Sequence, residues 1–302
     1  MTGLGVAAPP RGGIDVDLPG DGVRLAATRF PGPGATPVVL LHGLSSQRRF
    51  WNLVVPQLEG MPLLALDQRG HGDADRPESD YALTTVARDL ATALDAVGLS
   101  RVVVVGHSWG GAVAATFAAE FSHRTLALVA IDGGFTSPLS DGADRAVRRR
   151  QLEPPRIAVA PDELIAGMRS RTPVGRWTDD VAAAVLPIFE VGADGLARPR
   201  LPFDRHMQIV DTLLDYDAMD VLGRVHCPTW LVSCESVDDV VPDDGSDARN
   251  DWSAARAKAL TAVARVRPDA HILRWGGAVH DVPLQWPALV AGLIRAAVDE
   301  AG

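Results

Sequence analysis

Cysteine and lysine are nearly absent from this sequence. Its 302 residues include two cysteines, Cys227 and Cys234. Two cysteines are too few for a disulfide framework, and their spacing is not that of a metal-binding pair. We therefore expect free thiols and no metal site. Lys258 is the only lysine and the net charge is -9, so the chain lacks the concentrated basic surface that nucleic-acid binding requires.

Long apolar segments are also missing. No run of about 18 apolar residues occurs, as a membrane-spanning helix would need. The first residues, MTGLGVAAPPRGG, lack the basic start and apolar stretch of a signal peptide. We therefore expect a soluble cytoplasmic protein with no membrane partner. Hydrophobic residues make up 47% of the chain and charged residues 22%, which is typical of a globular enzyme.

Short apolar runs alternate with helical patterns along most of the chain. Residues 14–30 form two alternating segments joined at Gly20-Asp21-Gly22, which predicts a hairpin at the edge of a sheet. Other runs predict strands covered on both faces, as in a parallel sheet; they are 37–43, 63–67, 102–107, 126–132 and 229–234. Helical patterns separate them at 50–58, 84–97, 110–120, 253–263 and 286–298. This alternation predicts an α/β fold with a mostly parallel, doubly wound sheet.

One region interrupts the alternation. Residues 135–222 contain many prolines, no convincing buried strand, and amphipathic pieces such as 162–169 and 178–186. The simplest interpretation is a helical cap inserted between two parts of one core. The predicted division is therefore a core of residues 1–134 and 223–302 with a cap of residues 135–222.

The stretch GHSWG at residues 106–110 follows four consecutive valines and precedes a helical pattern. At a sharp turn between strand and helix a serine can be held as an exposed nucleophile, and its neighbours must be small for the turn to close. Gly106 and Gly110 meet that need. The helix that starts here also directs backbone N–H groups at the site, which favours a developing negative charge. Ser108 is therefore the predicted nucleophile.

A serine hydroxyl needs a histidine to accept its proton. His280 follows the strand-like segment HILRW on a loop, at the edge of the sheet where open α/β sheets bind ligands, and it is the predicted base. His107 adjoins Ser108, but neighbouring side chains of a strand point to opposite faces. His206, in the cap, is a candidate for substrate contact or for a solvent-facing position.

The base needs a carboxylate to fix its tautomer. Asp238 and Asp239 follow the predicted strand 229–234, and Asp132 ends the preceding strand. Position alone leaves all three open.

These motifs together resemble the α/β-hydrolase superfamily, in particular its compact capped members with a serine nucleophile, from about residue 14 to residue 298. The resemblance is carried by His42-Gly43 after a strand, by DQRGHG at 67–72, by GHSWGG at 106–111 and by His280 ahead of Pro287. It implies the order Ser108, acid, His280 along the chain. In the family a proline follows the acid by four positions, and counting back from Pro242 selects Asp238, although Cys234 stands where the family has a glycine.

The resemblance also implies an oxyanion hole formed by the backbone N–H groups of Leu44 and Trp109. It implies that Arg69 and His71 brace loops, and that no metal or organic cofactor is needed. The expected reaction is hydrolysis of a carboxylic ester or lactone of a small, apolar molecule. The dehalogenase and epoxide-hydrolase relatives carry aspartate at the position of Ser108.

Two other functions fit the same residues. The triad could serve carbon–carbon bond cleavage, elimination or cyclisation, or the fold could be a ligand receptor with an unused serine. Long side chains in the cap are candidates for lining the pocket or for packing the cap onto the core; besides His206 they are Trp177, Phe189, Phe203 and Met207. The sequence gives no indication of the oligomeric state.

Overall fold

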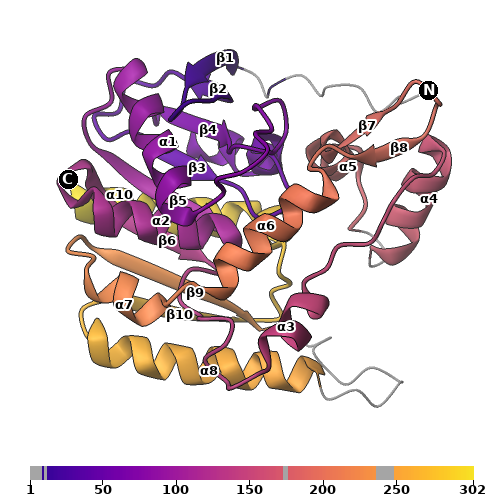
Figure 1. Ribbon diagram of the computed structural model, residues 1–302. Coiled ribbons are helices and arrows are strands. Elements are labelled where there is room, and N and C mark those ends of the chain that lie inside the picture. The colour runs from indigo at the N-terminus through magenta and orange to yellow at the C-terminus, as the bar shows by residue number, and fades with distance from the viewer. Residues whose placement is uncertain (1–8, 10–11, 173–175, 236–247) are drawn as a thin grey trace.

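An eight-stranded sheet forms the centre of the molecule (Figure 1). The computed structural model describes residues 9, 12–172, 176–235 and 248–302. The strand order is β1-β2-β4-β3-β5-β6-β9-β10. β1 and β2 pair antiparallel, β2 pairs antiparallel with β4, and the remaining neighbours are parallel. The strands are β1 (Ile14–Pro19), β2 (Arg24–Phe30), β3 (Val38–Leu41), β4 (Leu63–Asp67), β5 (Val102–His107), β6 (Thr125–Ile131), β9 (Thr229–Glu235) and β10 (His271–Gly276).

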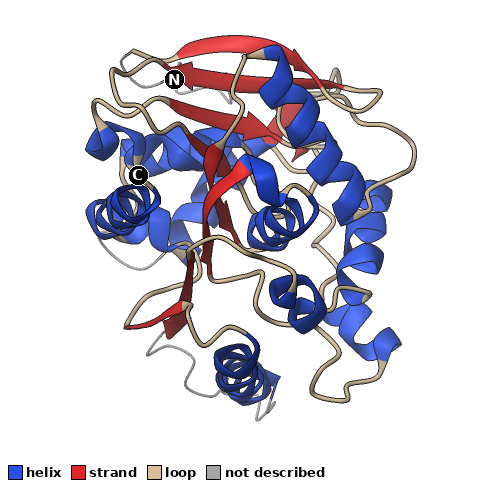
Figure 2. Ribbon diagram, turned by 90° about the vertical axis from the view of Figure 1, so that its left-hand side faces the viewer, coloured by secondary structure: helices blue, strands red, loops and turns tan. Residues whose placement is uncertain are grey.

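The central strands are apolar on both faces because helices cover both sides of the sheet. Along β5, Val102 and Val104 belong to one hydrophobic cluster, whereas Val103 and Val105 belong to a second cluster on the other face. This alternation follows from the two-residue period of a strand. Figure 2 shows the sheet from another side, with helices on either side of it.

The helices divide between the two faces. The first cluster includes residues of α1 (Leu83–Ala96), α2 (Trp109–Glu120), α7 (Ala218–Gly223) and α8 (Ala248–Val266). The second includes residues of α10 (Pro287–Ala301), of the short α9 (Val282–Gln285) and of two 3₁₀ helices, η1 (Arg48–Leu53) and η2 (Val55–Leu58). A third 3₁₀ helix, η3 (Ser122–Arg124), joins α2 to β6.

Between β6 and β9 lies an inserted segment that we call the cap. It contains α3 (Arg145–Gln151), α4 (Pro161–Arg171), α5 (Asp179–Val185), η4 (Leu186–Ile188), β7 (Phe189–Val191), β8 (Ala197–Pro199) and α6 (Phe203–Leu214). The sequence predicted a helical cap. The cap is largely helical, but it also contains β7 and β8, which pair as a small antiparallel sheet. Strands of three residues are too short for the alternating pattern to reveal them. The predicted division of the chain at residues 135 and 222 stays a prediction.

Most of the expected elements are confirmed. The hairpin lies at the edge of the sheet, and all five apolar runs are strands in it. The helix expected at 50–58 is wrong, since the structure has η1 and η2 there. Pro56 has no backbone N–H and interrupts a continuous α-helix; the 3₁₀ bonds that replace it run from Val54 N–H to the Trp51 carbonyl (2.9 Å) and from Gln57 N–H to the Val54 carbonyl (2.9 Å).

Both cysteines are free, as expected from their number and spacing, and both are buried. Burial raises the pKa of the Cys227 thiol to about 11. Among the helices that the structure describes, none has the length and apolarity to span a membrane.

The turn after β5 leaves no space for added side-chain atoms. A Cβ atom on Gly110 would lie 2.5 Å from the His42 carbonyl oxygen and 2.6 Å from that of Leu41. Because these neighbours are backbone atoms, they cannot move aside without distorting β3 and the loop that follows it.

We expect Gly110→Ala to lower the free energy of unfolding by about 1–3 kcal/mol, the usual effect of overpacking. The measurement is chemical denaturation of both proteins. Gly292→Ala is the matched control: an added Cβ there meets nothing within 4 Å, and alanine in mid-helix should stabilise by roughly 0.5–1 kcal/mol. Equal stability of the Gly110 variant and the wild type would contradict the close approach.

Candidate active site

Ser108 lies on the sharp turn between β5 and α2. Its backbone has φ 55° and ψ -123°, a region that costs a non-glycine residue about 1–3 kcal/mol. Two hydrogen bonds hold the turn, from the Ser108 N–H to the Ile131 carbonyl (2.9 Å) and from the Gly111 N–H to the Ser108 carbonyl (2.8 Å). The strained turn projects the hydroxyl beyond the end of the strand.

Asp132 occupies the matching position at the end of the neighbouring strand. His107 of β5 pairs with Ile131 of β6, so the residues that follow these two strands are neighbours. Asp132 also has a positive φ of 48°. Its carboxylate is buried, with 1% of the side chain exposed, and accepts a hydrogen bond from the Cys234 N–H (2.9 Å).

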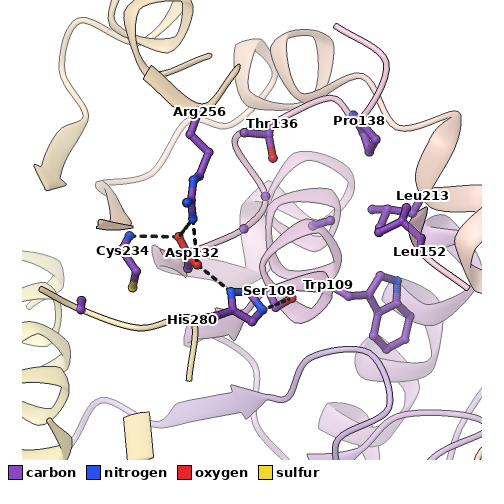
Figure 3. A pocket seen from close by; sticks show the side chains of 14 residues that line it. Ser108, Trp109, Asp132, Thr136, Pro138, Leu152, Leu213, Cys234, Arg256 and His280 are labelled. Carbon is purple, nitrogen blue, oxygen red and sulfur yellow. Dashed lines mark hydrogen bonds and ion pairs between the residues drawn. The ribbon is translucent and has the colours of Figure 1, made fainter. Parts of the chain in front are cut away.

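His280 lies between these two side chains (Figure 3). The Ser108 hydroxyl donates to His280 Nε2 (3.0 Å), and His280 Nδ1–H donates to Asp132 Oδ2 (2.6 Å). The loop that carries His280 is bonded to the end of β5, because His107 Nε2–H donates to the His280 carbonyl (2.8 Å). One ring therefore connects a hydroxyl and a buried carboxylate, which is the arrangement of a Ser-His-Asp triad.

The carboxylate at His280 differs from the predicted one. Asp238, which we predicted, and Asp239 lie outside the described residues. The Nδ1 atom of a neutral imidazole carries a single proton, and that proton is directed at Asp132. The acid in this structure is therefore Asp132, the third candidate that position had left open, and the choice of Asp238 from the spacing to Pro242 is corrected.

A guanidinium group that the sequence analysis missed also contacts this acid. Arg256 Nη1 lies 3.2 Å and 3.4 Å from the two carboxylate oxygens of Asp132. Arg256 comes from α8, more than one hundred residues along the chain. No local motif marks it, because its importance depends only on the packing of α8 beside β9.

The charges at this site shift the pKa values of Asp132 and His280 in opposite directions. Burial tends to raise the pKa of Asp132, but the hydrogen bond and charge of His280 and the charge of Arg256 outweigh burial, so the pKa is lowered. Burial tends to lower the pKa of His280, but the hydrogen bond and charge of Asp132 outweigh it, so that pKa is raised. The carboxylate is thus ionised wherever the imidazole can act as a base.

The backbone around Ser108 offers two N–H groups to a developing anion. An added Cβ on Gly43 would lie 3.1 Å from Ser108 Cβ, so the loop after β3 passes beside the nucleophile. No residue in the described part of the chain accepts a hydrogen bond from the Leu44 N–H. Trp109 begins α2, and the first N–H groups of a helix have no partner within it. This geometry is consistent with the predicted oxyanion hole.

Two further buried histidines stabilise the loops around the site. His42 Nε2 accepts from the Gln68 N–H (3.2 Å), and His71 Nε2 accepts from the Ser45 N–H (3.2 Å). Burial lowers the pKa of His42 to about 4 and that of His71 well below its ordinary value, so both rings are neutral and can accept these bonds. Arg69 forms a buried ion pair with Asp89 (2.6 Å). The expected bracing role of the 67–72 motif is confirmed.

A cavity of about 390 Å³ opens from Ser108 and His280. Its wall away from the triad is mainly apolar and comes from both core and cap, with Ala112, Trp109, Pro138, Leu152 and Leu213. Thr136 and Arg256 add polar groups near Asp132 (Figure 3). The cap therefore encloses the site over its apolar side.

The five cap residues proposed from the sequence are not among the described residues that line this cavity. Phe189 is buried within the cap against Leu164 and Ala197. Met207 and Phe203 pack with Val210 and Leu214 of α6, and Trp177 is half-buried. The alternative interpretation, packing of the cap onto the core, fits Phe203 and Met207, whose cluster includes Leu44 of the core. It does not fit Phe189, which packs within the cap. The sequence shows that a side chain is apolar, but it does not distinguish a place in the wall of the cavity from a place in the packed interior.

His206 also lies away from the cavity wall. It is buried, at 7% exposure, and its two ring nitrogens bond to the Ser45 hydroxyl and to the Leu152 carbonyl. Within the described residues, no group of three or more His, Cys, Asp or Glu side chains is placed to hold a metal ion.

Comparison with known proteins identifies the fold. Residues 36–156 match a family model described as the alpha/beta hydrolase fold. "Epoxide hydrolase A" of Mycobacterium tuberculosis is 37% identical over 115 residues, which are 37% of this chain and 36% of that protein. The chain spans only about a third to a half of the length of such curated relatives.

Solved structures cover almost the whole chain. E-2-(acetamidomethylene)succinate hydrolase has a TM-score of 0.75 at 23% identity, over 95% of this chain and 99% of that one. A thermophilic esterase from Thermogutta terrifontis has a TM-score of 0.67 at 20% identity, over 95% and 99%. The sheet order, the serine on its strand-to-helix turn and these matches agree, and the chain has the α/β-hydrolase fold.

Proposed function

We propose that this protein is a serine hydrolase that cleaves a carboxylic ester or lactone of a small molecule. The single observation that supports it is the position of His280, whose two ring nitrogens lie 3.0 Å from Ser108 Oγ and 2.6 Å from Asp132 Oδ2. Serine at position 108 separates the chain from the aspartate-bearing epoxide-hydrolase relatives. A relative's name therefore does not carry over, although the esterase similarity favours the proposal.

The proposed reaction proceeds through an acyl-enzyme. Ser108 Oγ attacks the carbonyl carbon as its proton passes to His280 Nε2, and Asp132 stabilises the imidazolium. The Leu44 and Trp109 N–H groups donate to the oxyanion. Collapse of the intermediate expels the alcohol oxygen, which takes the proton from His280. Water, deprotonated by His280, then attacks the acyl carbon, and the acid is released as the proton returns to Ser108.

The cavity favours a substrate with an apolar portion. The carbonyl carbon would lie beside Ser108, and the cap-side wall of Leu152, Leu213 and Pro138 would contact the rest of the molecule. A volume of about 390 Å³ is in the range of small-ligand pockets. The proposed reaction needs only side-chain and backbone groups of the chain itself, together with water.

Replacement of the nucleophile tests the proposal directly. Ser108→Ala should abolish turnover of aryl esters and lactones, leaving at most the residual catalysis of about 10³–10⁴-fold over water that binding and the oxyanion hole provide. Hydrolysis rates are measured for both proteins, with circular dichroism to verify the fold. Unchanged turnover would eliminate the mechanism.

The pH dependence of kcat/KM should reflect the raised pKa of His280. The base works only when neutral, so activity is present above that pKa and is lost as the pH falls through it. We expect the midpoint above 6.5, the ordinary value for imidazole. Asp132→Asn should shift the midpoint to lower pH, because burial alone lowers the pKa, and should reduce kcat by about 10⁴-fold.

Arg256→Met should shift the midpoint of the pH profile in the opposite direction to Asp132→Asn. The positive charge of Arg256 lowers the pKa of His280, so its removal should move the midpoint further upward. Midpoints that stay the same in all three proteins would show that Asp132 and Arg256 do not act on the base.

A further inference from the structure

Ser45 holds a strained position directly after Leu44, the residue whose N–H is assigned to the oxyanion hole. Its φ is 59°, in the left-handed region that a serine seldom adopts. Such a conformation persists when surrounding contacts over-determine it. Whatever fixes Ser45 therefore also fixes the direction of the Leu44 N–H.

One hydrogen bond to Ser45 comes from the core. The Ser45 N–H donates to His71 Nε2 (3.2 Å), and His71 Nδ1–H donates to the Arg69 carbonyl (3.0 Å). This chain of bonds anchors the backbone of Ser45 to the turn after β4. It does not involve the side chain of Ser45.

A second hydrogen bond to Ser45 comes from the cap. The Ser45 hydroxyl donates to His206 Nδ1 (2.8 Å), and His206 Nε2–H donates to the Leu152 carbonyl (3.1 Å). His206 lies on α6, 161 positions from Ser45. Burial lowers the pKa of His206, which keeps the ring neutral and leaves Nδ1 able to accept.

A second side chain of the same loop also reaches the cap. Gln47 Nε2–H donates to the Ala184 carbonyl of α5 (2.8 Å), and Gln47 Oε1 accepts from the Arg49 N–H (2.8 Å). Two different cap helices thus bond to the loop that carries Leu44. Leu152, whose carbonyl holds His206, also lines the cavity.

We infer that His206 is a positioning residue for the reaction. Acting through the Ser45 hydroxyl, it holds the Leu44 N–H in the oxyanion hole. It thereby links the position of the cap on the core to stabilisation of the transition state. This inference rests on the proposed serine-hydrolase function. It assigns His206 no contact with substrate, and the burial of His206 also excludes the solvent-facing position that the sequence had left open.

The test separates kcat from KM. His206→Leu should lower kcat for an aryl ester by roughly tenfold to a hundredfold, less than the ~10²–10³-fold effect of losing a whole oxyanion donor, with KM changed less than twofold. The rate of Ser108 labelling by a fluorophosphonate should fall by the same factor. His206→Asn, whose amide oxygen can replace Nδ1 as acceptor, should recover most of the loss.

A double-mutant cycle tests whether His206 affects kcat through Ser45. Ser45→Ala should lower kcat by a factor similar to that of His206→Leu, and the double variant should lose no more than either single variant. Gln208→Ala is the matched control, because Gln208 lies on the same helix and donates to the Glu78 carbonyl (3.0 Å), away from the loop. It should retain wild-type kcat. If His206→Leu does not fold, the small change Ser45→Ala carries the test alone.

The outcomes distinguish this inference from the proposed function. Turnover retained by Ser108→Ala overturns the function and the inference together. Turnover lost in Ser108→Ala but unchanged kcat in His206→Leu and Ser45→Ala overturns the inference alone. A loss confined to KM, or losses that multiply fully in the double variant, would likewise contradict a positioning role.

Discussion

The hydrogen bonds of one imidazole ring determine what this molecule can do. His280 can connect Ser108 to Asp132 only because three strand ends meet at one edge of the sheet. β5 and β6 are paired neighbours, which brings the hydroxyl and the carboxylate side by side, and the loop after β10 brings the ring across them. The parallel arrangement of the sheet is therefore a precondition of the site.

The site also requires backbone conformations that the chain alone would not favour. Ser108, Asp132 and Ser45 all have positive φ values. Each is fixed by its backbone N–H, which donates to a neighbouring segment. The acceptors are the Ile131 carbonyl, the Val232 carbonyl and the His71 ring, respectively. A core packed on both faces of the sheet is rigid enough to hold such strain. Stability and reactivity are thus linked through the same strand ends.

Sequence predicted those parts of the site that carry a local signal. Ser108 follows a valine run and lies between glycines, and His280 follows a strand, so each was identified from its own neighbours. The acid was not, because two strand ends offered a carboxylate to one histidine, and only packing shows that Asp132 takes Nδ1. Arg256 and the Ser45–His206 contact join segments more than one hundred residues apart, which no local pattern reveals. Cap residues such as Phe189 were recognised as apolar, but their destination depends on how the cap folds.

A crystal structure of the protein after reaction with a fluorophosphonate would show whether Ser108 is the nucleophile and His280 its base. We expect a covalent bond from phosphorus to Ser108 Oγ, a phosphoryl oxygen within hydrogen-bonding distance of the Leu44 and Trp109 nitrogens, and His280 Nδ1 bonded to Asp132. An adduct on another residue would contradict these roles. So would a ring of His280 that has turned away from Ser108, or one whose Nδ1 is bonded to Asp238.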